Sequence, residues 1–165
     1  MTGSARRRGF DAERELALRL WSKGFAVVRG PASGSRARRL IYPDLVALYH
    51  GRIFVFEVKY RRSGGPLYVE AEQARRLEEF ARRAGGEAYI AVKVPRRGWR
   101  LVPLESAAYT PSGRLRIGEE ELETAPTLEE FIRSVVNAAL PLEGGESRPG
   151  KLSSQPSSGE GSGRE

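Results

Sequence analysis

The chain has 165 residues, a formal net charge of +7 and a charged fraction of 30%, which predicts one globular domain with a single core. It contains no cysteine and one histidine, so disulfide scaffolds, thiolate zinc sites and cysteine nucleophiles are excluded and a Ser-His-Asp triad is disfavoured. No apolar run approaches the roughly 18 residues that span a bilayer, and the N-terminus lacks the apolar stretch of a signal peptide, so we expect a cytoplasmic protein without a membrane partner.

The two ends of the chain have the composition of disordered segments. Residues 1–9 are short and basic, and residues 142–165 consist mainly of Gly, Ser, Glu and Pro with few apolar side chains. Neither segment carries enough apolar surface to offset the entropy cost of folding. We therefore expect a disordered basic arm at 1–9, one folded domain at 10–141 and a disordered tail at 142–165.

Hydrophobic periodicity and turn residues predict eight elements between these ends. A helix over 11–24 directs Leu16, Leu20 and Trp21 inward, and strands follow at 25–29, 45–49 and 53–60, the last two joined by a turn at His50-Gly51. A helix over 70–84, strands at 87–94 and 99–102 and a helix over 127–140 complete the set. The order α-β-β-β-α-β-β-α predicts an α/β fold with a mixed central β-sheet flanked by helices.

Positive charge is concentrated in the first quarter of the chain. Residues 1–39 contain ten Lys and Arg side chains against three acidic ones, so this segment carries the whole net charge of +7. Such a surface suits a polyanion, either nucleic acid or an anionic membrane. The membrane is less favoured because the basic run lacks an amphipathic helix.

Two carboxylates are predicted to face each other across the 45–49/53–60 hairpin. A two-residue turn at His50-Gly51 pairs Asp44 with Glu57, and Lys59 then points to the same face. Side chains at such positions have Cβ atoms about 5 Å apart, where two charges repel by a few kcal/mol at an effective dielectric of about 20. The fold tolerates this repulsion if one acid is protonated or if a cation lies between them. The alternative is a frayed strand end with surface charges and a salt bridge.

A hard divalent cation is the better neutraliser of this pair, because one ammonium group cannot balance two carboxylates. Mg²⁺ in proteins is typically held by a few carboxylates together with water and phosphate. A third acid, Glu13, lies on the inward face of the first helix, one turn before Leu16 and Ala17. It either joins the other two acids or complements the positive end of the helix dipole.

Several motifs together resemble one known family. Pro-Asp at 43–44 and Glu-Val-Lys at 57–59 are similar to the core of the PD-(D/E)XK nuclease superfamily. With Arg-Arg-Arg-Gly at 6–9 followed by Glu-Arg-Glu-Leu at 13–16, KGFAVVRGPASGS at 23–35 and YVEAEQA at 68–74, the chain resembles archaeal-type Holliday junction resolvases over residues 6–140. The resemblance implies a restriction-endonuclease-like fold and a homodimeric endonuclease of recombination and repair, associated with the nucleoid. It would cut four-way junction DNA in paired strands with Mg²⁺, for which Mn²⁺ can substitute.

The resemblance also assigns roles to individual residues. Glu13, Asp44 and Glu57 become the metal ligands, and Lys59 the motif lysine that binds the attacking water or stabilises developing negative charge. Ser33 matches a serine that the family places in its active site, with a turn serine that bonds its own backbone as the alternative. Gln73 has a family-like position near the site, where it either orients a ligand or is an exposed helix residue.

Contacts to DNA phosphates are expected from arginines, which would give affinity with a steep salt dependence and little base reading. The expected set is Arg6, Arg7, Arg8, Arg29, Arg36, Arg38, Arg39, Arg61 and Arg62. A junction has two-fold symmetry, so symmetric nicks require a C2 dimer. Its contact comes from helix 70–84, with Leu77 and Phe80, or from the final helix, with Phe131, Ile132 and Val135, unless these residues belong to the core.

Two rival functions remain at this stage. One is another nuclease of the same superfamily that acts on duplex ends or single strands. The other is a non-catalytic junction-binding protein on a degenerate nuclease fold, which has no reason to retain carboxylates that repel one another.

Overall fold

A mixed five-stranded sheet forms the centre of the fold in the computed structural model, which describes residues 2–31, 42–62 and 64–140. Its strands are β1 (Ala26–Arg29), β2 (Leu45–Tyr49), β3 (Arg52–Tyr60), β5 (Glu87–Val94) and β6 (Gly98–Pro103). Their order is β1-β2-β3-β5-β6, in which β3 and β5 run parallel and the other neighbours antiparallel. The predicted mixed sheet flanked by helices is confirmed.

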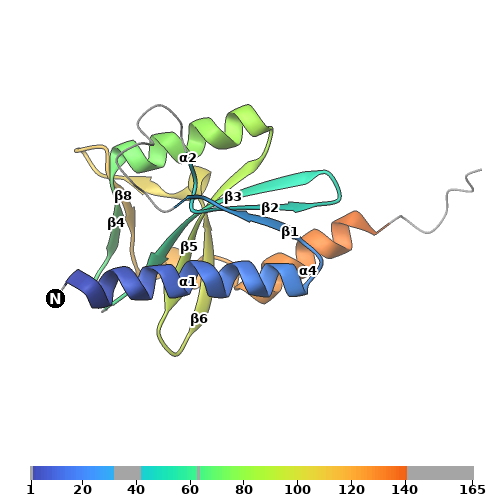
Figure 1. The fold of residues 1–165 in the computed structure, drawn as a ribbon. Coiled ribbons are helices and arrows are strands. Elements are labelled where there is room, and N and C mark those ends of the chain that lie inside the picture. The colour runs from blue at the N-terminus through green and yellow to red at the C-terminus, as the bar shows by residue number, and fades with distance from the viewer. Residues whose placement is uncertain (1, 32–41, 63, 141–165) are drawn as a thin grey trace, which may run out of the picture.

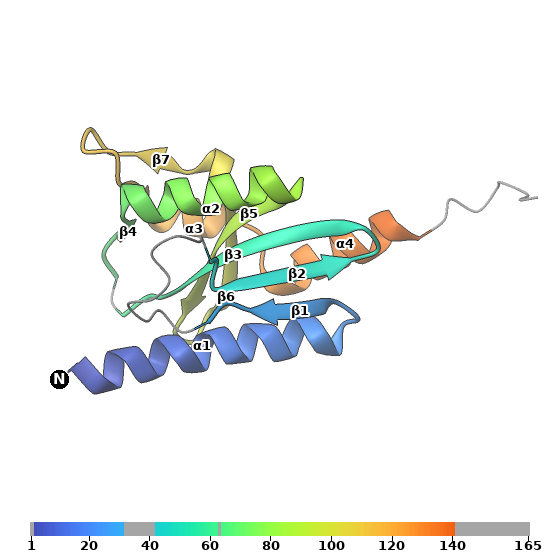
Figure 2. The same cartoon turned by 45° about the horizontal axis from the view of Figure 1, so that its top comes forward.

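Helices cover the two faces of this sheet and enclose two separate cores (Figure 1). Helices α1 (Thr2–Ser22) and α4 (Leu128–Ala139) pack on one face, where residues such as Leu16, Phe56 and Phe131 are buried. Helix α2 (Ala71–Ala84) packs on the other face, over Val55 and Ile90. Figure 2 shows α1 and α2 on opposite sides of the sheet.

The chain between β6 and α4 forms small elements that the sequence patterns did not predict. They are η1 (Leu104–Ser106), β7 (Ala108–Tyr109), β8 (Leu115–Ile117) and α3 (Glu119–Thr124). β8 lies between β7 and β4 (Leu67–Val69) in a second, three-stranded sheet, so the segment between the predicted strand at 53–60 and the predicted helix over 70–84 contains a strand as well. These elements are too short to show a clear period, yet they bury Leu115, Ile117 and Leu122 in the α2 core.

The β2–β3 hairpin has the register that the sequence predicts. Leu48 pairs with Ile53 and Leu45 with Phe56, and His50 and Gly51 have φ of 45° and 84°, as a type I′ turn requires. Extending this register by one pair places Asp44 opposite Glu57. The fold thus brings the two acids to the same end of the hairpin.

Helix α1 differs from the expectation at both of its ends. It begins at Thr2, so the segment expected to be a disordered arm is helical and carries Arg6, Arg7 and Arg8. Ala and Arg are good helix formers, and a helix extends cheaply from a turn already packed on the core. Trp21, expected inward, is 64% exposed because it lies about 100° around the helix from the fully buried Leu20.

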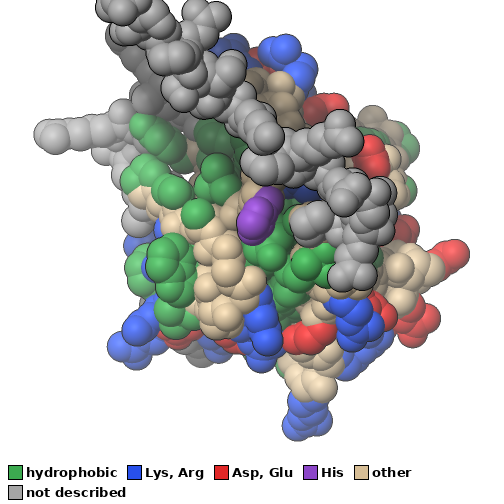
Figure 3. All heavy atoms as spheres, turned by 90° about the vertical axis from the view of Figure 1, so that its right-hand side faces the viewer, with side chains coloured by type: hydrophobic (Ala, Val, Ile, Leu, Met, Phe, Trp, Pro, Cys, Tyr) green, Lys and Arg blue, Asp and Glu red, His purple; other side chains and the backbone are tan. Residues whose placement is uncertain are grey.

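No helix among the described residues covers the β1–β2 part of the α2-side face of the sheet. Val28 on edge strand β1 is 60% exposed and Leu48 on β2 is 38% exposed, whereas Val55 on β3, beneath α2, is fully buried. Figure 3 looks onto the end of the molecule that carries His50 and shows hydrophobic side chains on both sides of it. By contrast Leu77, Phe131 and Val135 are core residues. Among the described residues no helix is both long and apolar enough to cross a membrane.

Candidate active site

Asp44 is fixed by the backbone on both sides of it. Its Oδ2 accepts a hydrogen bond of 2.7 Å from the Val58 N–H, and its carbonyl oxygen accepts one of 2.9 Å from the Gly30 N–H. A Cβ at position 30 would lie 2.1 Å from the Pro43 oxygen, so only glycine permits this approach of β1 to the start of β2. The Asp44 carboxylate is therefore held against β3, one residue from Glu57.

Glu57, Lys59 and Gln73 form a hydrogen-bonded triangle beside Asp44. Lys59 Nζ lies 2.9 Å from Glu57 Oε1 and 3.3 Å from Gln73 Oε1. The Gln73 Nε2 in turn donates to Glu57 Oε1 at 3.3 Å. Glu57 and Lys59 point to the α2 side of β3, and Gln73 reaches them from the first turn of α2. Gln73 thus contacts the acid–lysine pair directly, which excludes the interpretation that it is only an exposed helix residue.

The two facing acids both resist ionisation. Burial raises the pKa of the Asp44 carboxyl, against the Val58 hydrogen bond, which favours the charged form. Burial raises the pKa of Glu57 as well, and the neighbouring Asp44 charge raises it further, although Lys59 opposes both effects. The two carboxyls titrate as a coupled pair, and the backbone donor from Val58 favours negative charge on Asp44 rather than on Glu57.

Glu13 reaches the same end of the sheet from α1 but is bound to an arginine. Its Oε2 accepts a hydrogen bond of 3.1 Å from Arg29 Nη2, at the end of β1. Burial raises the pKa of Glu13, and Asp44 adds to this, while the Arg29 hydrogen bond lowers it. The Arg29 guanidinium carbon also lies 4.5 Å from the centre of the Phe10 ring. The three predicted acids thus share one electrostatic environment.

The donor chemistry of the site suits a hard divalent cation. Asp44 and Glu57 supply carboxylate oxygens, and their raised pKa values indicate a local deficit of positive charge. Within residues 2–31, 42–62 and 64–140, however, no three His, Cys, Asp or Glu side chains form a ready-made metal-binding group. Asp44 and Glu57 therefore fit as a ligand pair, with Glu13 beside them and engaged by Arg29.

Of the nine arginines expected to contact DNA, Arg61 is placed differently. It is 5% exposed, its Nη1 lies 2.7 Å from Glu119 Oε2, and its Nε and Nη2 donate to the Gly65 carbonyl. This arginine holds the loop after β3 against α3 and has no free edge for a phosphate. Arg62 beside it is exposed, as are Arg6 and Arg7. Ser33, Arg36, Arg38 and Arg39 lie outside the described residues.

Sequence reasoning missed the partnership of Arg29 with Phe10 and Glu13. Arg29 was expected to bind phosphate, and no local pattern links it to a helix that begins 27 residues earlier. Only the spacing of Glu13 from the buried Leu16 indicated that this acid points toward the sheet.

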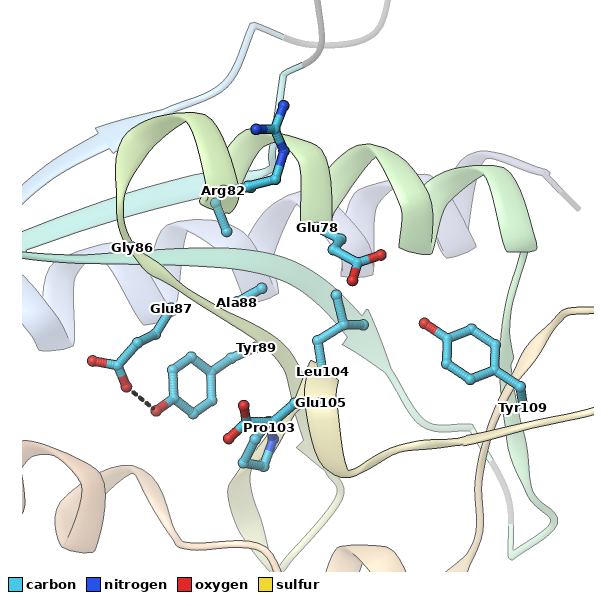
Figure 4. Close-up of a pocket in the computed structure, with 11 residues that line it drawn as sticks. Glu78, Arg82, Gly86, Glu87, Ala88, Tyr89, Pro103, Leu104, Glu105 and Tyr109 are labelled. Atoms are coloured by element: carbon cyan, nitrogen blue, oxygen red, sulfur yellow. Dashed lines mark hydrogen bonds between the residues drawn. The ribbon is translucent and has the colours of Figure 1, made fainter.

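A cavity lies away from these acids. It has a volume of about 420 Å³ and lies between α2, β5, η1 and β7 (Figure 4). Its lining includes Glu78, Tyr89, Glu105 and Tyr109 but none of the predicted site residues. Tyr89 donates a 3.0 Å hydrogen bond to Glu87, and burial and this bond raise the Tyr89 pKa. The acids and Lys59 therefore form a site separate from this cavity.

Comparisons with known proteins agree with this geometry. A family model described as archaeal Holliday junction resolvase (Hjc) matches residues 4–139. Similar proteins named crossover junction endodeoxyribonuclease Hjc include that of Sulfurisphaera tokodaii, 41% identical over 80% of this chain and 90% of the relative. That of Sulfolobus acidocaldarius is 33% identical over 80% of this chain and 91% of the relative.

A solved structure is also similar. The Hjc of Archaeoglobus fulgidus, described as a Holliday junction resolvase from an archaeal hyperthermophile, superposes with a TM-score of 0.69 at 34% identity. The match covers 75% of this chain and 99% of the other. The restriction-endonuclease-like fold expected from the sequence is thereby confirmed.

Proposed function

Because the chain belongs to the archaeal Holliday junction resolvase family, we propose that it cleaves four-way junction DNA as a Mg²⁺-dependent endonuclease. The observation that carries the proposal is the partly buried Asp44–Glu57 pair with Lys59 at 2.9 Å from Glu57. A binding protein gains nothing from two carboxylates that raise each other's free energy. A nuclease uses them to hold a cation.

The residues of the site divide the work of phosphodiester hydrolysis. Asp44 and Glu57 would hold Mg²⁺, with Mn²⁺ as a substitute, and Glu13 would join them directly or through water. When bound, the ion lowers the pKa of a water molecule and neutralises charge on a phosphate oxygen. Lys59 carries three donors, of which Glu57 and Gln73 engage two. The third is available to hold the attacking water or a phosphate oxygen in the transition state.

DNA is proposed to lie along the N-terminal half of α1. This half carries Arg6, Arg7 and Arg8 and leads directly to Glu13, so the proposed phosphate contacts lie on the same helix as one of the three acids. Such contacts give affinity without base reading. Selectivity for a junction then comes from the way two active sites span its arms.

We propose a C2 homodimer in which the uncovered sheet face around Val28 and Leu48 contacts the second copy. These two side chains are on the α2 side of the sheet. In the β1–β2 ladder Val28 pairs with Val46, and Leu48 pairs with Ala26. Paired nicks in a two-fold junction require two sites. A Leu48→Asp variant is expected to be monomeric by light scattering and to cut single strands of the junction without pairing the two cuts. A dimer that persists in this variant places the contact elsewhere.

The deciding experiment compares a four-way junction with a linear duplex of the same sequence, with and without Mg²⁺. Wild type is expected to cleave only the junction and only with metal, whereas Asp44→Asn binds the junction without cleaving it. Equal cleavage of the linear duplex favours a different nuclease of the superfamily. Binding without metal-dependent cleavage by wild type favours a non-catalytic protein.

A further inference from the structure

Arg29 is held in an unusual setting between α1 and the acids. Its guanidinium is packed on the Phe10 ring and paired with Glu13, and its side chain is 30% exposed. Its Nε is buried and has no hydrogen-bond partner within the described residues. Arg29 therefore has unused donor capacity at Nε, and its guanidinium, on a side chain that is partly exposed, is a group that binds carboxylates and phosphates in the same bidentate manner.

The formal charges around Arg29 can be balanced by one divalent cation together with one further anion. Glu13, Asp44 and Glu57 oppose Arg29 and Lys59, which leaves a single net negative charge when all five groups are ionised. One divalent cation changes this to a single positive charge, which matches the charge of one phosphodiester. Arg29 acts electrostatically on Asp44 as well as on Glu13.

We propose that Arg29 exchanges Glu13 for a DNA phosphate and thereby couples DNA binding to metal binding; this rests on the function proposed above. A guanidinium edge that binds a phosphate no longer holds the Glu13 carboxylate. Glu13 is then able to join Asp44 and Glu57 as a ligand. Because such coupling is reciprocal, DNA tightens metal binding by the same factor by which metal tightens DNA binding.

The first test measures Ca²⁺ binding to the full chain without DNA by calorimetry, in wild type, Arg29→Gln, Glu13→Gln and the double variant. Arg29→Gln releases Glu13 and is expected to bind Ca²⁺ about fivefold more tightly or better, the lower end of usual coupling factors. In the Glu13→Gln background the same change is expected to alter affinity by less than about twofold. If Arg29→Gln increases Ca²⁺ affinity equally in the wild-type and Glu13→Gln backgrounds, the cause is a general charge effect and the proposed exchange is wrong.

Arg52 provides a matched control for this test. Its Nη2 lies 2.6 Å from Glu87 Oε1 and its guanidinium carbon 4.9 Å from the Phe54 ring centre. Like Arg29 it therefore has a carboxylate partner and an aromatic contact, but it lies at the opposite end of β3 from the acids. Arg52→Gln is expected to leave Ca²⁺ affinity unchanged. A gain equal to that of Arg29→Gln contradicts the proposal.

The second test measures junction affinity by fluorescence anisotropy with and without Ca²⁺. Wild type is expected to bind at least about fivefold more tightly with Ca²⁺, and Arg29→Gln to lose most of this difference. Full retention of the difference in Arg29→Gln overturns the exchange while leaving the nuclease assignment intact. Failure of the nuclease assignment looks different, because Ca²⁺ binding would then be insensitive to Glu57→Gln.

Discussion

Replacing Glu57 with glutamine is expected to make the protein more stable and inactive at the same time. The substitution keeps the shape of the side chain and removes one of two facing charges. Burial and the Asp44 charge both raise the pKa of Glu57, so its surroundings favour the neutral form despite Lys59. A permanently neutral side chain therefore suits the metal-free fold better than a carboxylate.

The size of the effect follows from three contributions. Two charges about 5 Å apart repel by about 3 kcal/mol at an effective dielectric of about 20. Loss of the partly exposed ion pair with Lys59, at 2.9 Å, offsets about 1 kcal/mol. The amide oxygen of the introduced glutamine still accepts hydrogen bonds, so the net gain is about 1–2 kcal/mol, or roughly 3–6 °C in Tm for a domain of this size.

Thermal unfolding in EDTA at pH 7.5, followed by circular dichroism, measures this gain. Glu72→Gln is the matched control, because Glu72 pairs only with Arg75 and Arg76 on the exposed side of α2. A junction-cleavage gel with Mg²⁺ is expected to show no product for Glu57→Gln. A lower Tm than wild type, or cleavage at saturating Mg²⁺, refutes the reasoning.

Three further outcomes are expected. Glu13, Asp44 and Glu57 have raised pKa values in the folded chain, so the stability they contribute is present at acidic pH and is lost as the pH rises through those values. The Tm advantage of Glu57→Gln over wild type in EDTA is therefore expected to shrink between pH 7 and pH 4. An advantage that stays constant over this range contradicts the assignment. Arg61→Met removes the donors to the Gly65 carbonyl and is expected to cost roughly 1–2 kcal/mol in urea unfolding, whereas Arg62→Met serves as a near-neutral control. Deletion of residues 2–8 removes three arginines and is expected to lower the slope of log K against log salt for junction binding by about 2–3; an unchanged slope excludes α1 from the DNA path.

The features that could be predicted from the sequence are those fixed by local chemistry. The His50-Gly51 turn and the alternation of the flanking strands determine the β2–β3 register, so the opposition of Asp44 and Glu57 followed from a few residues. The roles of individual site residues, and the metal itself, stay predictions. The structure does show that the site residues within the described ranges lie close together.

The features that could not be predicted depend on residues distant in the sequence. Arg61 and Arg62 look alike as neighbours in a polar loop, and only α3, 58 residues later, distinguishes the buried one through Glu119. Trp21 continues an apolar run and was therefore assigned to the core. The buried stripe of α1 is narrower, because Ala12, Leu16 and Leu20 at four-residue spacing already fill it.

The position of β3 at the middle of the sheet affects how the site loses its structure on heating. Glu57 and Lys59 lie on a strand that pairs with β2 as far as Phe56 and with β5 along its second half, where Lys59 faces Val92. Backbone amides in such a strand exchange their hydrogens with solvent only through global opening, whereas helix ends and loops open locally. Glu57 and Lys59 therefore lie in a part of the protein that loosens late on heating, and these two groups are expected to stay in place until the domain melts.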